Sequence, residues 1–242
     1  MKWVPDRTMR FAQRPHYESA EMDGECEDTI TRFLRQHHGK VVFPIDTNDI
    51  IVLLEHEAND LDIYADLSAE GRDVEGVTYF NGTGKPDVKI ARHLAEEPRA
   101  AHRFRTTATH ELGHVKFHSF LWLTESRPAS LFPEAEPSVV PASPRCKRDS
   151  IQSLAQTDWM EWQAGYACGA FLMPVTYLKR VVDEVRAEKR WSQPPQVDSE
   201  EGRYLIGHVG QRFDVSPDAA RVRLTQLRLI ATQPQQSERL FG

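Results

Sequence analysis

The stretch His110-Glu111-Leu112-Gly113-His114 decides how the rest of the chain is interpreted. In a helix, residues four apart stand on one face, about one turn from each other. His110 and His114 can therefore contact the same metal ion, and Glu111 can reach a water molecule at that ion as a general base. This H-E-x-x-H pattern is typical of zinc peptidases. The apolar residues that flank it indicate a buried helix rather than a solvated one.

A second segment downstream offers a third metal ligand. Residues 159–174 form an apolar stretch of helix length that holds one acid, Glu161. The small residues Ala164, Gly165 and Cys168 follow it at helical spacing, and such a face would let this helix approach the first closely. Glu161 would then complete a three-ligand site with an open fourth position. Periodicity leaves another interpretation open, in which Glu161 is a partly exposed acid favoured by the helix dipole.

Apolar periodicity and turn residues predict the order of the other elements. Gly113, inside the motif helix, costs about 1 kcal/mol relative to alanine, which indicates that something packs closely there. Strands at 77–80 and 88–90 flank a turn-rich loop and indicate an antiparallel hairpin. The remaining predicted elements are a helix at 25–38, a helix capped by Asp46 or Thr47 with its apolar run at 50–54, a strand at 61–67, the motif helix at 100–123, a helix at 177–189 and two helices within 204–230.

The domain organisation follows from the segments that lack such patterns. Residues 1–23 are polar and aperiodic, and are predicted to be a flexible N-terminal arm. Residues 24–232 are predicted to form one domain, and residues 233–242 a C-terminal tail. Within that domain, 124–158 is predicted to be a long loop, because its closely spaced prolines exclude most helix.

Composition limits the classes of function. The chain has 242 residues and 40% apolar side chains, which is enough for a sizeable core. A net charge of -6 gives no support to bulk nucleic-acid binding. The three cysteines are widely spaced, so they are expected to be reduced thiols in a cytoplasmic protein. No apolar run reaches the length of a membrane span, and none resembles a signal peptide.

Two residues near the motif have open interpretations. His118 continues the four-residue spacing, but it lies about 12 Å along the helix axis from His110, too far for one ion to take both. We expect it to support the ligands or to pack. Cys146 lies between basic residues on the long loop, and its thiolate could cap the metal ion as a latch. It could equally be an ordinary loop cysteine.

The C-terminal segment also has two interpretations. Two helices separated by Val215-Ser216-Pro217, with Arg221, Arg223 and Arg228 on and after the second, could contact DNA as a helix-turn-helix. Nearby acids and the acidic chain argue against it. We therefore favour a role in closing off the catalytic domain.

Three separated motifs, in this order, resemble the ImmA/IrrE family of metallo-endopeptidases. They are Arg-Thr-Thr-Ala-Thr-His-Glu-Leu-Gly-His-Val-Lys-Phe-His at 105–118, Glu-Trp-Gln-Ala with Phe-Leu-Met-Pro within 161–174, and Phe-Asp-Val-Ser-Pro-Asp-Ala-Ala-Arg-Val-Arg-Leu at 213–224. The resemblance covers about residues 27–230. One departure is Gly165, where the family usually has asparagine, so a hydrogen bond behind the ligands is expected to be missing.

Site chemistry and resemblance together imply a fold and a function. The expected fold is α+β, with a zincin-like helical core, a small antiparallel sheet and a C-terminal helical tail. The expected activity is zinc-dependent endopeptidase cleavage, with Glu111 as catalytic residue and His110, His114 and Glu161 as ligands; Mn²⁺ and Fe²⁺ are alternatives to Zn²⁺. The resemblance implies that the substrate is a helix-turn-helix repressor in a stress or mobile-element circuit. The rival hypothesis is a metal-containing regulator or toxin–antitoxin component without protease activity.

Overall fold

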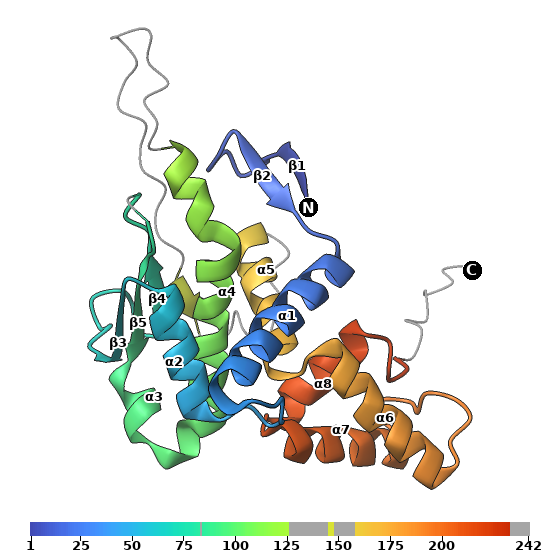
Figure 1. Ribbon diagram of the computed structural model, residues 1–242. Coiled ribbons are helices and arrows are strands. Elements are labelled where there is room, and N and C mark those ends of the chain that lie inside the picture. The colour runs from blue at the N-terminus through green and yellow to red at the C-terminus, as the bar shows by residue number, and fades with distance from the viewer. Residues whose placement is uncertain (83, 126–144, 148–157, 233–242) are drawn as a thin grey trace, which may run out of the picture. The chain divides into compact units, whose positions relative to one another are not determined.

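The computed structural model of the protein describes residues 1–82, 84–125, 145–147 and 158–232. It confirms the predicted α+β class, with helices and two small sheets (Figure 1). Its internal contacts divide the chain into two compact units, Met1–Pro174 and Val175–Gly242, where the sequence suggested one domain over 24–232. The first unit contains the whole H-E-x-x-H motif and Glu161.

The N-terminal residues form a hairpin instead of the predicted flexible arm. Strands β1 (Lys2–Pro5) and β2 (Gln13–His16) pair antiparallel. The carboxylate of Asp6 shapes the loop between them by accepting hydrogen bonds from the amides of Thr8 and Phe11, at 2.9 and 3.1 Å. Strands of four residues are too short to produce a periodic signal, which is why the sequence pattern did not reveal them.

Two helices follow, and side-chain caps set where they begin. Helix α1 (Ser19–His38) starts earlier than predicted, because Glu18 and Glu21 form a capping box. It ends at Gly39, whose φ of 69° is easily adopted by glycine. Helix α2 (Thr47–Glu57) is capped by Asp46, as predicted, through a hydrogen bond from the amide of Asn48.

The main sheet has the strand order β3-β5-β4-β6. Strands β4 (Val74–Tyr79) and β5 (Asp87–Ala91) form the predicted antiparallel hairpin. Strand β3 (Asp60–Ala65) pairs with β5 in parallel, so the sheet is mixed rather than wholly antiparallel. The sequence predicted β3 as a strand, but alternation along one strand does not indicate which edge of a hairpin it joins.

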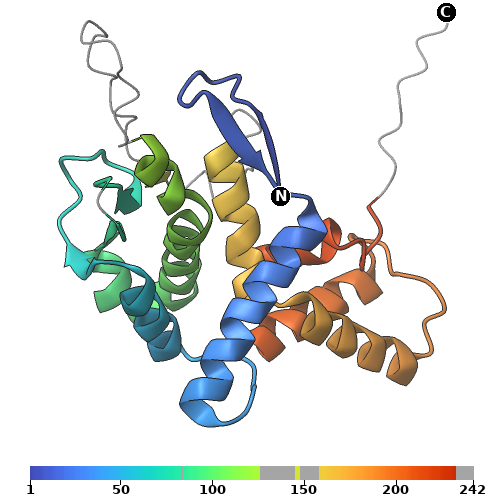
Figure 2. The ribbon, with the colours of Figure 1, turned by 45° about the horizontal axis from the view of Figure 1, so that its top comes forward.

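Helix α4 (Ala101–Glu125) is the centre of the first unit. It packs against α5 (Trp159–Leu172), α2 and β4, and it follows the short helices α3 (Arg92–Glu96) and η1 (Pro98–Ala100). Figure 2 shows α4 and α5 side by side. A Cβ atom at Gly113 would lie 3.0 Å from the Cα atom of Ala164 and 3.2 Å from the Cβ atom of Ala167. The close packing predicted at Gly113 is thus confirmed.

The second unit consists of α6 (Val175–Lys189), α7 (Glu200–Phe213) and α8 (Pro217–Gln226). Ser199 and Ser216 cap α7 and α8, and Pro217 occupies the first turn of α8. Arg223 is fully buried, and Arg221 forms an ion pair with Asp218 at 3.2 Å. Of the three arginines considered for DNA contact, one is therefore paired with an acid and another has no exposed side chain.

The long loop and the tail are described only in part. Within the predicted loop 124–158, residues 126–144 and 148–157 lie outside the described residues, as does the predicted tail at 233–242. Strand β6 (Arg145–Lys147) pairs antiparallel with β4 and sets the backbone of Cys146 opposite Gly76. Its side chain is not among the described parts, so the hypothesis of a thiolate cap stays a prediction.

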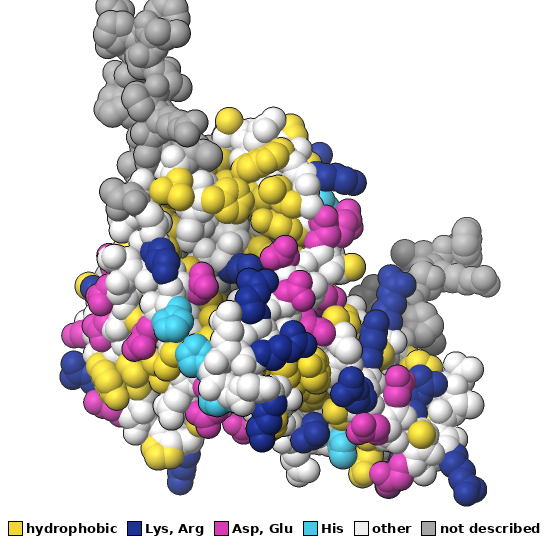
Figure 3. All heavy atoms as spheres, in the orientation of Figure 1, with side chains coloured by type: hydrophobic (Ala, Val, Ile, Leu, Met, Phe, Trp, Pro, Cys, Tyr) yellow, Lys and Arg dark blue, Asp and Glu magenta, His cyan; other side chains and the backbone are white. Residues whose placement is uncertain are grey.

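The surface of the first unit has an apolar region over β1, β2 and the end of α4 (Figure 3). Exposed apolar side chains of these elements include Trp3 and Leu123, and the Trp3 ring meets Phe120 edge-on at 5.8 Å. None of the described helices is both long and apolar enough to cross a lipid bilayer.

The helix contact at Gly113 yields a prediction about stability. In Gly113→Ala the new methyl group would press on the α5 backbone, which cannot move aside as a flexible side chain can. We expect a net loss of about 1–2 kcal/mol in the free energy of unfolding, because overpacking outweighs the gain in helix propensity. Urea titration followed by circular dichroism measures this.

Gly24→Ala in α1 is the matched control, since a Cβ atom there would have open space. It should leave stability unchanged or raise it by up to about 1 kcal/mol. Equal effects of the two substitutions would contradict the assigned role of Gly113.

Candidate metal centre

The structure brings together the three predicted ligands. His110 Nε2 lies 3.2 Å from Glu161 Oε2, and His114 Nε2 lies 3.3 Å from Glu161 Oε1. The two imidazole Nε2 atoms are 3.2 Å apart. All the candidate ligand atoms lie within 4.8 Å of one another, and both histidines are fully buried. Glu161 does lie in the first turn of its helix and is partly exposed, as the alternative interpretation had it, but its carboxylate contacts both histidines.

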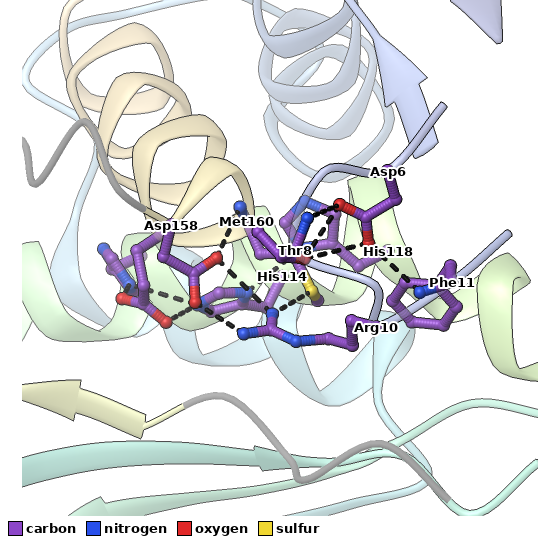
Figure 4. A network of polar contacts seen from close by, with 10 residues as sticks. Asp6, Thr8, Arg10, Phe11, His114, His118, Asp158 and Met160 are labelled. Atoms are coloured by element: carbon purple, nitrogen blue, oxygen red, sulfur yellow. Dashed lines mark hydrogen bonds and ion pairs between the residues drawn. The ribbon is translucent and has the colours of Figure 1, made fainter. Parts of the chain in front are cut away.

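The N-terminus of α5 is fixed by contacts that also position Glu161, which lies in the first turn. Asp158 caps the helix by accepting a hydrogen bond from the amide of Met160 at 3.0 Å. Arg10, from the β1–β2 loop, forms an ion pair with Asp158 at 2.7 Å (Figure 4). Phe11 beside it meets the Trp159 ring at 6.2 Å. The N-terminal hairpin thus holds the start of the helix that carries the third ligand.

Electrostatics within the cluster favour a charged carboxylate beside charged imidazole. Burial alone would raise the pKa of Glu161, but the positive charge of His114 and hydrogen bonds from His110 and His114 hold it well below its usual value. Burial alone would lower the pKa of His114, but the Glu161 carboxylate raises it above its usual value. A divalent cation would take the place of the proton in stabilising this carboxylate.

Glu111 is held by the sheet next to the motif helix. Thr78 in β4 donates a hydrogen bond to Glu111 Oε2 at 2.6 Å. A Cβ atom at Gly76 would overlap Glu111 Oε1, so only glycine lets the strand approach this carboxylate. Glu111 Oε1 is buried and has no hydrogen-bond partner among the described residues. Burial raises the pKa of Glu111, and the charges of His114 and His110 and the Thr78 hydrogen bond oppose that rise only in part.

Behind His114, three further groups continue the polar contacts. His118 Nδ1 lies 3.0 Å from His114 Nδ1, and His118 Nε2 lies 3.0 Å from the side-chain oxygen of Gln163. The Gln163 amide nitrogen donates to the carbonyl oxygen of Pro15 in β2, at 3.0 Å. His118 is therefore behind the ligands and outside the ligand set, in agreement with the prediction for it.

The donor set fits a divalent metal ion. Two imidazole nitrogens and one carboxylate, with a further position open, are the ligands of one class of catalytic zinc site. The buried Oε1 of Glu111 has no hydrogen-bond partner among the described residues, and a buried polar atom of this kind normally has one. The cluster His110, His114 and Glu161 is thus a candidate metal centre on both its geometry and its chemistry.

Several residues of the site could not be picked out from the sequence. They come from segments far from the motif and have no spacing relation to it: Arg10, Pro15, Gly76, Thr78 and Gln163. Gln163 belongs to the second motif segment, at 161–174, yet nothing in the local pattern indicated that its amide faces His118. Gly76 had a weak signal, since glycine inside a strand often marks close approach of another group.

Comparisons with known proteins leave the chain unassigned. No protein-family model matches it, and no curated protein matches it. Function is therefore inferred from the residues of the site and from the motif resemblance.

The first prediction for this site concerns metal content. Purified protein should hold about one divalent ion per chain. His114→Ala and Glu161→Ala should lose most of it, because each removes one of three ligands. Inductively coupled plasma mass spectrometry after dialysis measures the occupancy. His102→Ala, an exposed position on the same helix, is the control and should keep full occupancy.

The second prediction concerns pH. Because the pKa of His114 is raised, a proton competes with the metal ion for His114 Nε2 as the pH falls through that pKa. Metal affinity should therefore weaken on acidification, by about tenfold per pH unit for each proton displaced. Isothermal titration in two buffers of different ionisation enthalpy measures the protons released. A pH-independent affinity with no proton release would contradict His114 as a ligand.

Proposed function

We propose that the protein is a zinc-dependent endopeptidase. One observation carries the proposal. The Glu111 carboxylate lies buried beside the two histidines of the cluster, with one oxygen fixed by Thr78 and the other without a partner among the described residues. A site that served only structure would need no such acid, and structural zinc usually has four protein ligands that leave no open position.

The residues of the chain have separate tasks in peptide hydrolysis. His110, His114 and Glu161 would hold the ion, and a zinc ion in such a site supplies polarisation of the scissile carbonyl and acidification of water. Glu111 Oε1 accepts the proton of the attacking water and then delivers that proton to the leaving amine. The carboxylate is suited to both steps because it cannot rotate away while Thr78 holds Oε2.

The electrostatic setting of Glu111 supports this role. A general base works best when its pKa lies nearer the working pH than that of an ordinary carboxyl group. Burial moves the pKa of Glu111 in that direction. The same burial excludes bulk water, which would otherwise compete for the proton in transit.

The substrate class is proposed from the resemblance to the ImmA/IrrE family. On that basis the substrate is a helix-turn-helix repressor, cleaved in the cytoplasm as part of a stress or mobile-element circuit. The acidic net charge supports a protein substrate over direct DNA contact. The ion pair of Arg221 with Asp218 and the burial of Arg223 point the same way.

The test of catalysis is Glu111→Gln. The amide keeps the shape and can still accept from Thr78, but it cannot take a proton from water. We expect metal content to be unchanged and cleavage to fall by about 10²-fold or more. Cleavage of β-casein, as a general protein substrate, and of any helix-turn-helix repressor encoded by a neighbouring gene is followed by electrophoresis and mass spectrometry.

Glu55→Gln, at an exposed position on α2, is the control and should cleave as the wild type does. Undiminished cleavage by Glu111→Gln would overturn the mechanism. Metal-loaded wild-type protein that cleaves neither substrate, yet represses or derepresses transcription, would favour the rival hypothesis of a regulator without protease activity.

A further inference from the structure

The hydrogen bonds behind His114 all run the same way, from donor to acceptor, and this direction follows from what each atom can donate or accept. At one end is the carbonyl oxygen of Pro15, which can only accept a hydrogen bond. The group of Gln163 that faces it, at 3.0 Å, must therefore be the amide NH₂. This fixes the amide orientation, so that the Gln163 oxygen faces His118.

The proton of His118 lies on Nε2, as the partner of that atom shows. The Gln163 oxygen can only accept, so His118 Nε2, 3.0 Å away, must carry a proton and donate it. The His118 ring is fully buried, and its two nitrogens contact Gln163 and His114, neither of which is a carboxylate. A buried ring without a carboxylate beside it favours the neutral form, which carries one proton. His118 Nδ1 is then a bare acceptor.

His114 connects these hydrogen bonds to the candidate metal centre. His114 Nδ1 lies 3.0 Å from the bare Nδ1 of His118, so it must donate the hydrogen bond. The Nδ1 atom of His114 therefore carries a proton. Its other nitrogen, Nε2, is the one that faces His110 and Glu161, at 3.2 and 3.3 Å.

We propose that His118 and Gln163 are positioning residues that reserve Nε2 of His114 for the metal ion. They act through a one-way chain of hydrogen bonds from His114 to His118, to Gln163 and to the carbonyl oxygen of Pro15. The alternative tautomer of His114, with its proton on Nε2, would turn that proton toward the ion and leave two Nδ1 lone pairs facing each other. The inference rests on the metal site of the proposed function.

His110 differs from His114 in this respect and serves as an internal comparison. His110 Nδ1 has no hydrogen-bond partner among the described residues. Within the described residues, a buried chain of hydrogen bonds thus orients His114 and does not orient His110. Groups that orient a ligand in this way typically change metal affinity by about 10- to 100-fold when they are removed.

The first arm of the experiment uses two substitutions at one position. His118→Leu removes the acceptor for His114 Nδ1, whereas His118→Gln can supply an amide oxygen in its place. Zinc affinity is measured by competition with a chromogenic chelator. We expect affinity to fall by about 10- to 100-fold in His118→Leu and to be largely restored in His118→Gln. Phe104→Leu, a buried change on the same helix about four turns from His118, should unfold more easily but bind zinc normally.

The second arm reads the proton positions directly and needs no metal. Long-range ¹H–¹⁵N correlation spectra of ¹⁵N-histidine-labelled, metal-free wild-type protein should show His118 protonated at Nε2 and bare at Nδ1. In Gln163→Leu the acceptor for this Nε2–H group is gone, so its proton signal should shift upfield, whereas Nδ1 should stay bare because His114 still donates to it. A merely structural role for Gln163 would leave the Nε2–H signal unchanged.

The outcomes separate this inference from the proposed function. A wild-type spectrum with the His118 proton on Nδ1 would overturn the chain, even if zinc binds well. Wild-type zinc affinity in a folded His118→Leu protein would also overturn it. If that variant does not fold, the wild-type spectrum alone decides. A wild-type protein that binds no zinc would overturn the proposed function and the role of the chain, although the direction of the chain would still be measured.

Discussion

The close contact between α4 and α5 is the constraint on which the site depends. Gly113 lets the two backbones approach, and Ala164 and Ala167 form the facing surface. Because two candidate ligands belong to α4 and the third to α5, the distance between these helices sets the distance between the candidate ligand atoms. A separation larger by one methyl group would move the Glu161 carboxylate away from His110, whose Nε2 now lies 3.2 Å from it.

The hairpin and the sheet act on this helix pair from two sides. Arg10 and Pro15 contact α5 at its first turns, through Asp158 and Gln163. On the other side β4 presents Thr78 to Glu111. The ligands are thus oriented by one set of contacts and the proposed base by another. A substitution in β4 would be expected to affect proton transfer more than metal retention.

The sequence predicted the features that follow from local chemistry. The motif spacing identified His110, Glu111 and His114, and the cost of glycine within a helix indicated the contact at Gly113. Asp46 was recognisable as a cap because capping is also local. The hairpin at the N-terminus and the parallel pairing of β3 with β5 were missed, because both depend on which distant segment a strand joins. The contacts of Gln163 with His118 and Pro15 were missed because an amide has no preferred direction until its partners are known.

The last acceptor of the buried chain is a main-chain oxygen, that of Pro15. Every residue has such an oxygen, whatever its side chain. The hydrogen bond itself therefore makes no demand on the side chain at position 15, and comparison of aligned residues would give no sign of it. A change at Pro15, whose ring is buried, would report on packing and not on this contact. What evolution must preserve is the path of the backbone through β2, and that path is set by the residues that shape the turn before it.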